Sequence, residues 1–285
     1  MPVTQRWDGA GVLGTIALLE AALRLDSVSG SSLGLKLKNL GAEAEDLGIL
    51  LQAVKPRGPV AANAEVIREP SDVRQLTVLL SGTTCSYRRN YDGGRSILSF
   101  QHAGDFCDLH RYILPDHDHE IGVQALTDCT VAVIHYRDME RLLSRPTLAF
   151  AFWRASMLEA AVYRQRLTNT SRGTALERVA HLLCEQLARR EAVGIHAPRL
   201  PFSQIDVADA AGLSAVHVNR TIQSLRSLGV LSKASHIEVI DRERLEQLAK
   251  FDGLYLSPLQ SFPSLGSAGL ARLNPRSLSA RVPVA

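Results

Sequence analysis

A short stretch near the C-terminus, residues 213–227, carries side chains of the kind that read the edges of base pairs. At about 100° per residue of an α-helix, Val216, Arg220 and Gln223 fall on one side of it. A guanidinium pairs with guanine, a primary amide pairs with adenine, and a valine methyl contacts the methyl group of thymine. The stretch holds no acidic residue. This pattern favours a helix that enters the major groove of DNA, although an ordinary solvated helix also has a polar face.

The predicted contacts divide into those that specify the base sequence and those that hold the DNA backbone. His217 and Arg226 flank the outward face and are expected to touch phosphates. Lys233 and His236 are expected to do so from the tip of a hairpin over residues 229–240. The full set of predicted DNA-binding residues is Ser214, Val216, His217, Asn219, Arg220, Gln223, Ser224, Arg226, Lys233 and His236.

The local sequence also predicts how these residues are positioned. Residues 204–211 form a short helix with small side chains, and Gly212 follows it, which permits the positive backbone dihedral of a tight turn. Ser214 can cap the next helix by accepting hydrogen bonds from its free amide groups. Together with the hairpin that follows, these features predict a winged helix-turn-helix.

Upstream, residues 65–136 consist of short runs of β-branched or alternating residues separated by turn residues. Gly82 ends one run, Asp92-Gly93-Gly94 ends another, and residues 129–136 form a further run rich in valine and isoleucine. Several short strands joined by glycine-containing hairpins are typical of a compact β-sandwich or barrel. We therefore expect a β domain in this part of the chain.

Two helices are predicted between the β domain and the helix-turn-helix. The first begins near Pro146, a residue accepted in the first turn of a helix, and continues to about Thr168. Its apolar side chains, which include Trp153 and Met157, spread over more than one face. We expect its own domain to bury one face and a second copy of the chain to bury the other; one large monomeric core is the alternative. The second helix, residues 175–190, has a single apolar stripe.

The composition is that of a globular protein long enough for two domains. The chain has 285 residues, of which 46% are hydrophobic and 21% are charged, and a formal net charge of +3 that identifies no class of partner. Its four cysteines form no C-x-x-C pair, which favours reduced thiols. Glu20 and Arg24 interrupt the N-terminal apolar stretch that resembles a signal sequence. We expect a cytoplasmic protein without membrane association.

The two ends of the chain are the least informative parts. The N-terminal segment is expected to be partly helical, with short helices near residues 13–25 and 42–53. The other end lacks acidic residues and any periodicity, and is expected to be a disordered basic tail. The predicted order is an N-terminal segment (1–60), a β domain (61–144), a dimerisation helix (145–170), a winged helix-turn-helix (171–256) and the tail (257–285).

Residues 102–120 hold several histidines and aspartates, a combination that suits some transition metals. A polar surface loop over residues 115–120 accounts for them equally well, and we expect no metal site. No G-x-S-x-G, H-E-x-x-H or phosphate-binding loop occurs, and Cys107 near His110 is the only candidate nucleophile pair. We therefore expect no catalytic residues and no enzymatic activity.

The order of these parts resembles the cyclic-AMP receptor and fumarate-nitrate regulator (Crp/Fnr) family over roughly residues 60–255. Three motifs carry the resemblance: Gly104-Asp105-Phe106, the run from Arg178 to Cys184, and the run from Leu213 to Arg220, which has the form common in α-proteobacterial members. The resemblance implies an α+β fold of two domains. These are an N-terminal β-roll like the cyclic-nucleotide-binding jelly roll and a C-terminal winged helix-turn-helix, joined by a long dimerisation helix.

The sensor part departs from the family's cyclic-nucleotide members, in which an arginine holds the cyclic phosphate through a charged fork. The corresponding segments here read Cys107-Asp108-Leu109 and His119-Glu120-Ile121. Asp108 is expected to reach a ribose hydroxyl, but without the arginine, and with Glu120 beside the pocket, a phosphate is poorly held, and we expect no cyclic-AMP binding. The candidate ligand residues are Gly104, Asp105, Asp108, His119 and Glu120.

The resemblance also implies partners and excludes one cofactor. The first cysteine is Cys85, so the N-terminal cysteine cluster of the oxygen-sensing members is absent and we expect no iron-sulfur cluster. A homodimer on pseudo-palindromic double-stranded DNA is expected, with RNA polymerase as a further partner. Val216 stands where the best-known members have glutamate, so their operator is not carried over. The alternative is a small-molecule or metal-sensing module with weak or vestigial DNA binding.

Overall fold

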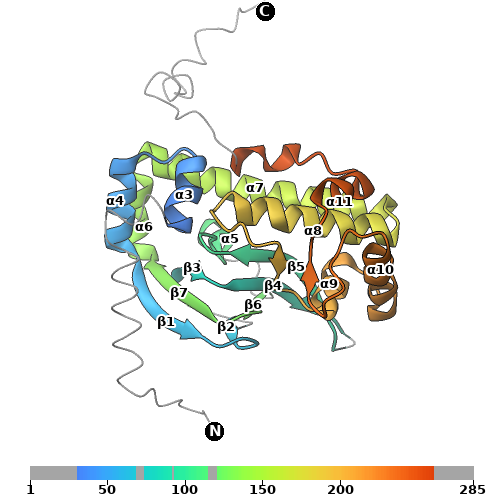
Figure 1. Cartoon of the computed structure of the whole chain (residues 1–285). Coiled ribbons are helices and arrows are strands. Elements are labelled where there is room, and N and C mark those ends of the chain that lie inside the picture. The colour runs from blue at the N-terminus through green and yellow to red at the C-terminus, as the bar shows by residue number, and fades with distance from the viewer. Residues whose placement is uncertain (1–30, 69–73, 92, 115–120, 260–285) are drawn as a thin grey trace, which may run out of the picture.

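The computed structural model describes residues 31–68, 74–91, 93–114 and 121–259. The predicted α+β fold is confirmed: a β domain lies below a long helix, and a small helical domain follows at the C-terminal side (Figure 1). The helix expected near residues 13–25 lies outside the described residues.

The β domain is built from two antiparallel sheets, one in the order β1-β7-β3 and the other in the order β2-β6-β4-β5. Leu79 and Val131 of the first sheet share an apolar core with Val66 and Val123 of the second. β1 pairs with β7, and so the sheet begins before residue 61, where we expected the domain to start. The strands are β1 (Lys55–Val60), β2 (Glu65–Ile67), β3 (Gln75–Ser81), β4 (Thr83–Arg89), β5 (Arg95–His102), β6 (Gly122–Ala125) and β7 (Cys129–His135).

Within the described residues, four short helices accompany the β domain. Two of them precede the first strand, and the second of these is the helix expected near residues 42–53. Leu37, Leu40 and Leu50 from this pair are buried against Met139 and Leu148, so the N-terminal segment is part of the core. The helices are α3 (Ser32–Asn39), α4 (Ala44–Ala53), α5 (Leu109–Ile113) and α6 (Tyr136–Leu143).

The long helix α7 (Pro146–Arg172) begins with proline in its first turn, as predicted, and ends before Gly173. The chain then reverses into α8 (Ala175–Glu191), which runs back beside α7 (Figure 1). Thr174 and Glu177 form a reciprocal capping box at the start of α8 and so fix the point of reversal.

The C-terminal domain contains the predicted helix pair, α9 (Gln204–Ala211) and α10 (Ala215–Ser227), followed by α11 (Arg242–Ala249). The expected hairpin closes through a bridge between Leu231 and Val239, while β9 (Ile237–Glu238) pairs with β8 (Arg199–Leu200). The predicted start of the disordered tail at residue 257 was wrong. Residues 257–259 belong to the 3-10 helix η1 (Leu254–Leu259), because Leu256 and Leu259 bury their side chains against α7.

Candidate nucleic-acid interface

The turn between α9 and α10 has the geometry that its sequence predicts. Gly212 adopts φ 62° and ψ 43°, the left-handed conformation that favours glycine. The side chain of Ser214 caps α10 by accepting a hydrogen bond from the backbone amide of His217. Ala208 and Ala211 are buried, and their small side chains allow α9 and α10 to approach each other closely.

The two sides of α10 differ sharply in exposure. Val218, Ile222 and Leu225 are completely buried, whereas 61% of the surface of Val216 is exposed. This orientation leaves one continuous face of α10 exposed to solvent, where the edge of a base pair can contact it. The predicted contact residues that are exposed on it are Ser214, Val216, His217, Asn219, Arg220 and Gln223, and Ser224 is half-buried.

Some outward side chains are held in place and others are not. Asn219 donates from Nδ2 to Oε1 of Gln204 at 3.0 Å, so α9 orients it. The side chains of Arg220 and Gln223 form no hydrogen bond or ion pair with any described residue. Their polar groups are therefore available to an external partner, which is the property that base recognition requires.

Arg226 has a different environment from the one expected. Its guanidinium donates from Nε to the carbonyl of Ser232 at 3.2 Å and from Nη2 to the carbonyl of Ala234. We predicted that Arg226 touches a phosphate; in the structure, its guanidinium ties α10 to the hairpin of residues 229–240, which we call the wing. Lys233 lies exposed between those two residues, while Nε2 of the half-buried His236 is 3.3 Å from Glu238 Oε2.

In the β domain, Gly104 and Asp105 form a turn that two other parts of the chain cover. Asp105 is buried and pairs with Lys36 of α3 and with Arg189 of α8, whose Nη2 lies 3.1 Å away. Burial raises the pKa of this carboxyl, but the two cations outweigh it and lower the pKa to about 2. The Asp105 carboxylate is thus occupied by internal cations rather than presented to a ligand.

Asp108 lies three residues further on and has the opposite electrostatic character. Its carboxylate accepts hydrogen bonds from the backbone amide and the hydroxyl of Thr77, at 2.7 and 3.2 Å. Burial raises its pKa to about 7 despite these bonds. Asp108 lines a cavity of about 290 Å³ together with Arg57 and Arg111, two cations that sequence reasoning missed. His119 and Glu120 lie outside the described residues.

His102 and Cys107, which belong to the suggested metal and nucleophile clusters, are both buried. No group of three His, Cys, Asp or Glu side chains among the described residues could hold a metal ion. His102 is buried and bonds to Gln186 at 2.9 Å, and burial lowers its pKa to about 3. All four cysteines are buried and free, and burial raises the pKa of the Cys107 thiol.

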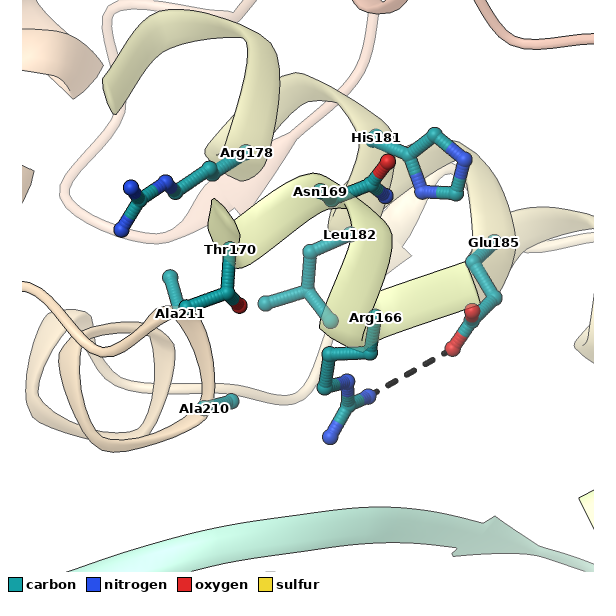
Figure 2. Close-up of a pocket in the computed structure, with 9 residues that line it drawn as sticks. All are labelled: Arg166, Asn169, Thr170, Arg178, His181, Leu182, Glu185, Ala210 and Ala211. Carbon is teal, nitrogen blue, oxygen red and sulfur yellow. Dashed lines mark ion pairs between the residues drawn. The ribbon is translucent and has the colours of Figure 1, made fainter. Parts of the chain in front are cut away.

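A small polar pocket marks the joint where α7, α8 and α9 meet (Figure 2). Arg166 points across it toward Glu185, at 3.5 Å, and Leu182 lies between them and Thr170. A Cβ atom on Gly212 would lie 3.9 Å from the Thr170 methyl group, so the turn of the helix pair touches the end of α7. The lining residues are Arg166, Asn169, Thr170, Arg178, His181, Leu182, Glu185, Ala210 and Ala211.

Within the part of the chain that the structure describes, no helix is both long and apolar enough to cross a membrane.

Comparison with known proteins connects both domains to one group of proteins. A model of the Crp-like helix-turn-helix domain matches residues 177–248, and a model of the cyclic nucleotide-binding domain matches residues 58–146. The nitrogen fixation regulation protein FixK of Rhizobium meliloti is 32% identical over 170 residues, which are 59% of this chain and 75% of that protein. The fumarate and nitrate reduction regulatory protein of Vibrio cholerae is 24% identical over 208 residues, 72% of this chain and 82% of its own.

A solved structure agrees with these sequence relatives. FixK2 from Bradyrhizobium japonicum superposes with a TM-score of 0.57 and 25% identity, covering 67% of this chain and 94% of its own. The two matched domains are thus similar in arrangement as well as in sequence.

Proposed function

Because the chain belongs to the Crp/Fnr family of DNA-binding transcription regulators, we propose that it acts in the cytoplasm as a homodimer on a pseudo-palindromic operator and needs no cyclic AMP. Its two α10 helices enter successive major grooves, about one helical turn apart. RNA polymerase is the partner through which bound protein alters transcription.

The observation that carries the DNA-reading role is the outer face of α10. Arg220 and Gln223 project from a helix that is capped at its start and anchored by a buried apolar side, and no described residue occupies their polar groups. Because the helix is rigid and carries side chains that can hydrogen-bond to bases, little conformational entropy is lost when it binds DNA. Arg220 is the side chain expected to contribute most to the choice of base.

An exposed apolar stripe on α7 supports the homodimer. Trp153, Met157 and Leu167 are 56%, 51% and 71% exposed, and at about 100° per residue they fall within about 80° of one another. Their spacing fits a seam between two parallel copies of α7, and a second copy would remove these side chains from water. The opposite side of α7 is already buried against its own chain.

Independence from cyclic AMP is supported by the separation of the candidate ligand residues. Asp108 lines the cavity of about 290 Å³, whereas Asp105 lies outside it and lines a space of about 30 Å³ beside α7. The Asp105 carboxylate in this smaller space is occupied by Lys36 and Arg189.

The test is selection of bound DNA from a random duplex pool at a fixed salt concentration near physiological, with and without cyclic AMP. The expected result is an inverted repeat that is enriched equally in both. Arg220→Ala should lower specific affinity by about 1–3 kcal/mol and relax the preference at one base pair per half-site. The control is Arg141→Ala, which removes an exposed guanidinium of α6 and should leave selection unchanged. Unchanged selection by Arg220→Ala would refute the proposed reader helix.

The cavity beside Asp108 favours a second candidate function, that of a small-molecule sensor with weak or vestigial DNA binding. Arg57 and Arg111, together with the carboxylate of Glu65, line a space large enough for a small anion, and burial raises the pKa of Asp108 to about 7. This function predicts that a panel of small carboxylates and phosphates contains a ligand that raises the melting temperature. It also predicts that the random pool yields no inverted repeat with or without that ligand.

A further inference from the structure

Arg95, at the start of β5, reaches out of the β domain and contacts the first helix of the DNA-reading pair. Its Nε donates to Asp209 Oδ2 at 2.7 Å, and its Nη2 pairs with Asp206 Oδ1. Its remaining nitrogen, Nη1, donates to the side chain of Gln124 on β6. One guanidinium, 23% exposed, therefore joins two strands of the sensor to α9. We call Arg95, Asp206 and Asp209 the clasp.

The clasp acts on a rigid element. Asp206 uses its second oxygen, Oδ2, to accept from the backbone amide of Ser203 at 2.7 Å, and Ser203 caps α9 in return. The same carboxylate thus belongs to the cap at the start of α9 and also binds the β domain. Because α9 packs directly on α10, any change in the direction of α9 also turns the reader face.

Contacts between the same two domains continue beside the clasp. The rings of Phe100 and Phe202 lie 4.4 Å apart, and their side chains belong to one apolar core that includes residues of both domains. Arg166 of α7, the helix that joins the two domains, donates to the carbonyl of Leu98 on β5 at 2.6 Å. The apolar contact supplies most of the attraction, while the clasp, with fixed donors and acceptors, selects one orientation.

This docking leaves the reader face open. The exposed residues of α10, which include Val216 and Arg220, lie on the side away from its buried apolar stripe, and no described residue pairs with Arg220. Contact between the domains therefore does not block access to DNA. It determines where each reader helix is held relative to the sensor.

We propose that Arg95 is a positioning residue for DNA recognition, which sets the separation between the two reader helices by clasping Asp206 and Asp209. The inference rests on the proposed function, because it requires a dimer that binds two half-sites at once. A winged helix-turn-helix that is fixed on its β domain binds the second half-site at a high effective concentration only when the spacing fits. If the clasp is broken, the domain accepts several spacings, but the gain in affinity at each of them is smaller.

The experiment measures binding of the full-length protein to a set of operators with identical half-sites and different spacers, at one salt concentration. Arg95→Gln should weaken binding at the best spacing about tenfold or more, and flatten the dependence on spacing. The base preference within each half-site should not change, because α10 itself is intact. Loss of packing alone would lower all affinities together and leave the spacing profile in place.

Two variants separate the clasp from nonspecific damage. Asp209→Asn, made at the other end of the pair, should give the same flattened profile, and combining it with Arg95→Gln should add little. Asp209→Asn also keeps the test available if Arg95→Gln fails to fold. Arg89→Ala is the matched control, because Arg89 lies on the neighbouring strand but pairs with Glu65 inside the sensor.

The outcomes are distinct. A flattened profile for both clasp variants and an unchanged profile for Arg89→Ala support the inference. A wild-type spacing profile for the clasp variants overturns the inference. Tighter binding of these variants at every spacing also overturns it, because the clasp would then hold the two DNA-binding domains away from DNA. If the wild-type protein itself selects no repeated half-site, the proposed function fails, and the inference fails with it.

Discussion

Replacing Gly104 by alanine tests how tightly the N-terminal helix α3 is held against the β domain. Gly104 has φ +90°, and a Cβ atom there would lie 2.5 Å from the carbonyl oxygen of Ser32 and 3.0 Å from the amide nitrogen of Leu33. Both neighbours are backbone atoms at the start of α3, so no side-chain rotation relieves the contact. Alanine at this position must push α3 away from the turn.

Two costs contribute to the expected loss of stability. The positive φ alone costs an alanine about 1–2 kcal/mol. Displacing packed backbone adds about 1–3 kcal/mol, as in other overpacked sites. The movement also strains the buried pair of Lys36 with Asp105 and the hydrogen bond from the Ser32 hydroxyl to the carbonyl of Val193, 2.9 Å long. The sum is about 2–5 kcal/mol for Gly104→Ala.

Gly93→Ala is the matched control. Gly93 has φ +83°, close to that of Gly104, but an added Cβ would meet nothing within 4 Å. It should lose only the conformational share, about 1–2 kcal/mol. The assay is thermal unfolding of both variants and the wild-type protein at one protein concentration. Equal shifts in melting temperature for the two variants would refute the reasoning, because they would mean that α3 does not rest on the turn.

Three further predictions concern pH, the wing and the dimer. Because burial raises the pKa of Asp108 from 3.8 to about 7, the folded protein retains a proton between these pH values that the unfolded chain releases. The contribution of Asp108 to the free energy of unfolding should therefore be highest below about pH 4 and should fall as the pH rises to about 7. Asp108→Asn should remove that decline in a series of melting temperatures against pH, and an equal slope in both proteins would contradict it. Arg226→Gln should release the wing, and with it the expected phosphate contact of Lys233, so that the negative slope of log affinity against log salt becomes shallower by about 1. Binding titrations at several salt concentrations would show this, and an unchanged slope would place the wing contact elsewhere. Met157→Lys should weaken the dimer at least about tenfold by placing a charge in the seam of α7, as measured by sedimentation equilibrium, and an unchanged dissociation constant would exclude that face as the interface.

The parts of the interface that were predicted correctly are those with a local physical cause. The cap at Ser214, the turn at Gly212 and the buried side of α10 each depend on residues within one or two helical turns. A period of 3.6 residues and a short list of capping side chains suffice to recognise them. The strands of the β domain were visible for the same reason, through their turn residues.

The features that were missed depend on residues far apart in the chain. Arg226 looked like a phosphate contact because its position on α10 is on the flank, and only the path of the wing brings two carbonyls to it. Leu259 looked like part of a disordered tail because its neighbours have no periodicity, and only the side of α7 that carries Leu158 and Val162 gives it a place to be buried. In both cases the partner surface has no signature in the local sequence.

The amino-acid sequence by itself determined the class of the protein, the location of its DNA-reading helix and the side of that helix that faces outward, because periodicity, capping and residue type are properties of short segments. Only the tertiary structure decided how those segments are used together. It placed Lys36 and Arg189 on Asp105, and it brought Arg95 to α9 across more than a hundred residues. The physical reason is that an ion pair depends on distance in space, and for residues so far apart that distance is set by the packing of whole elements.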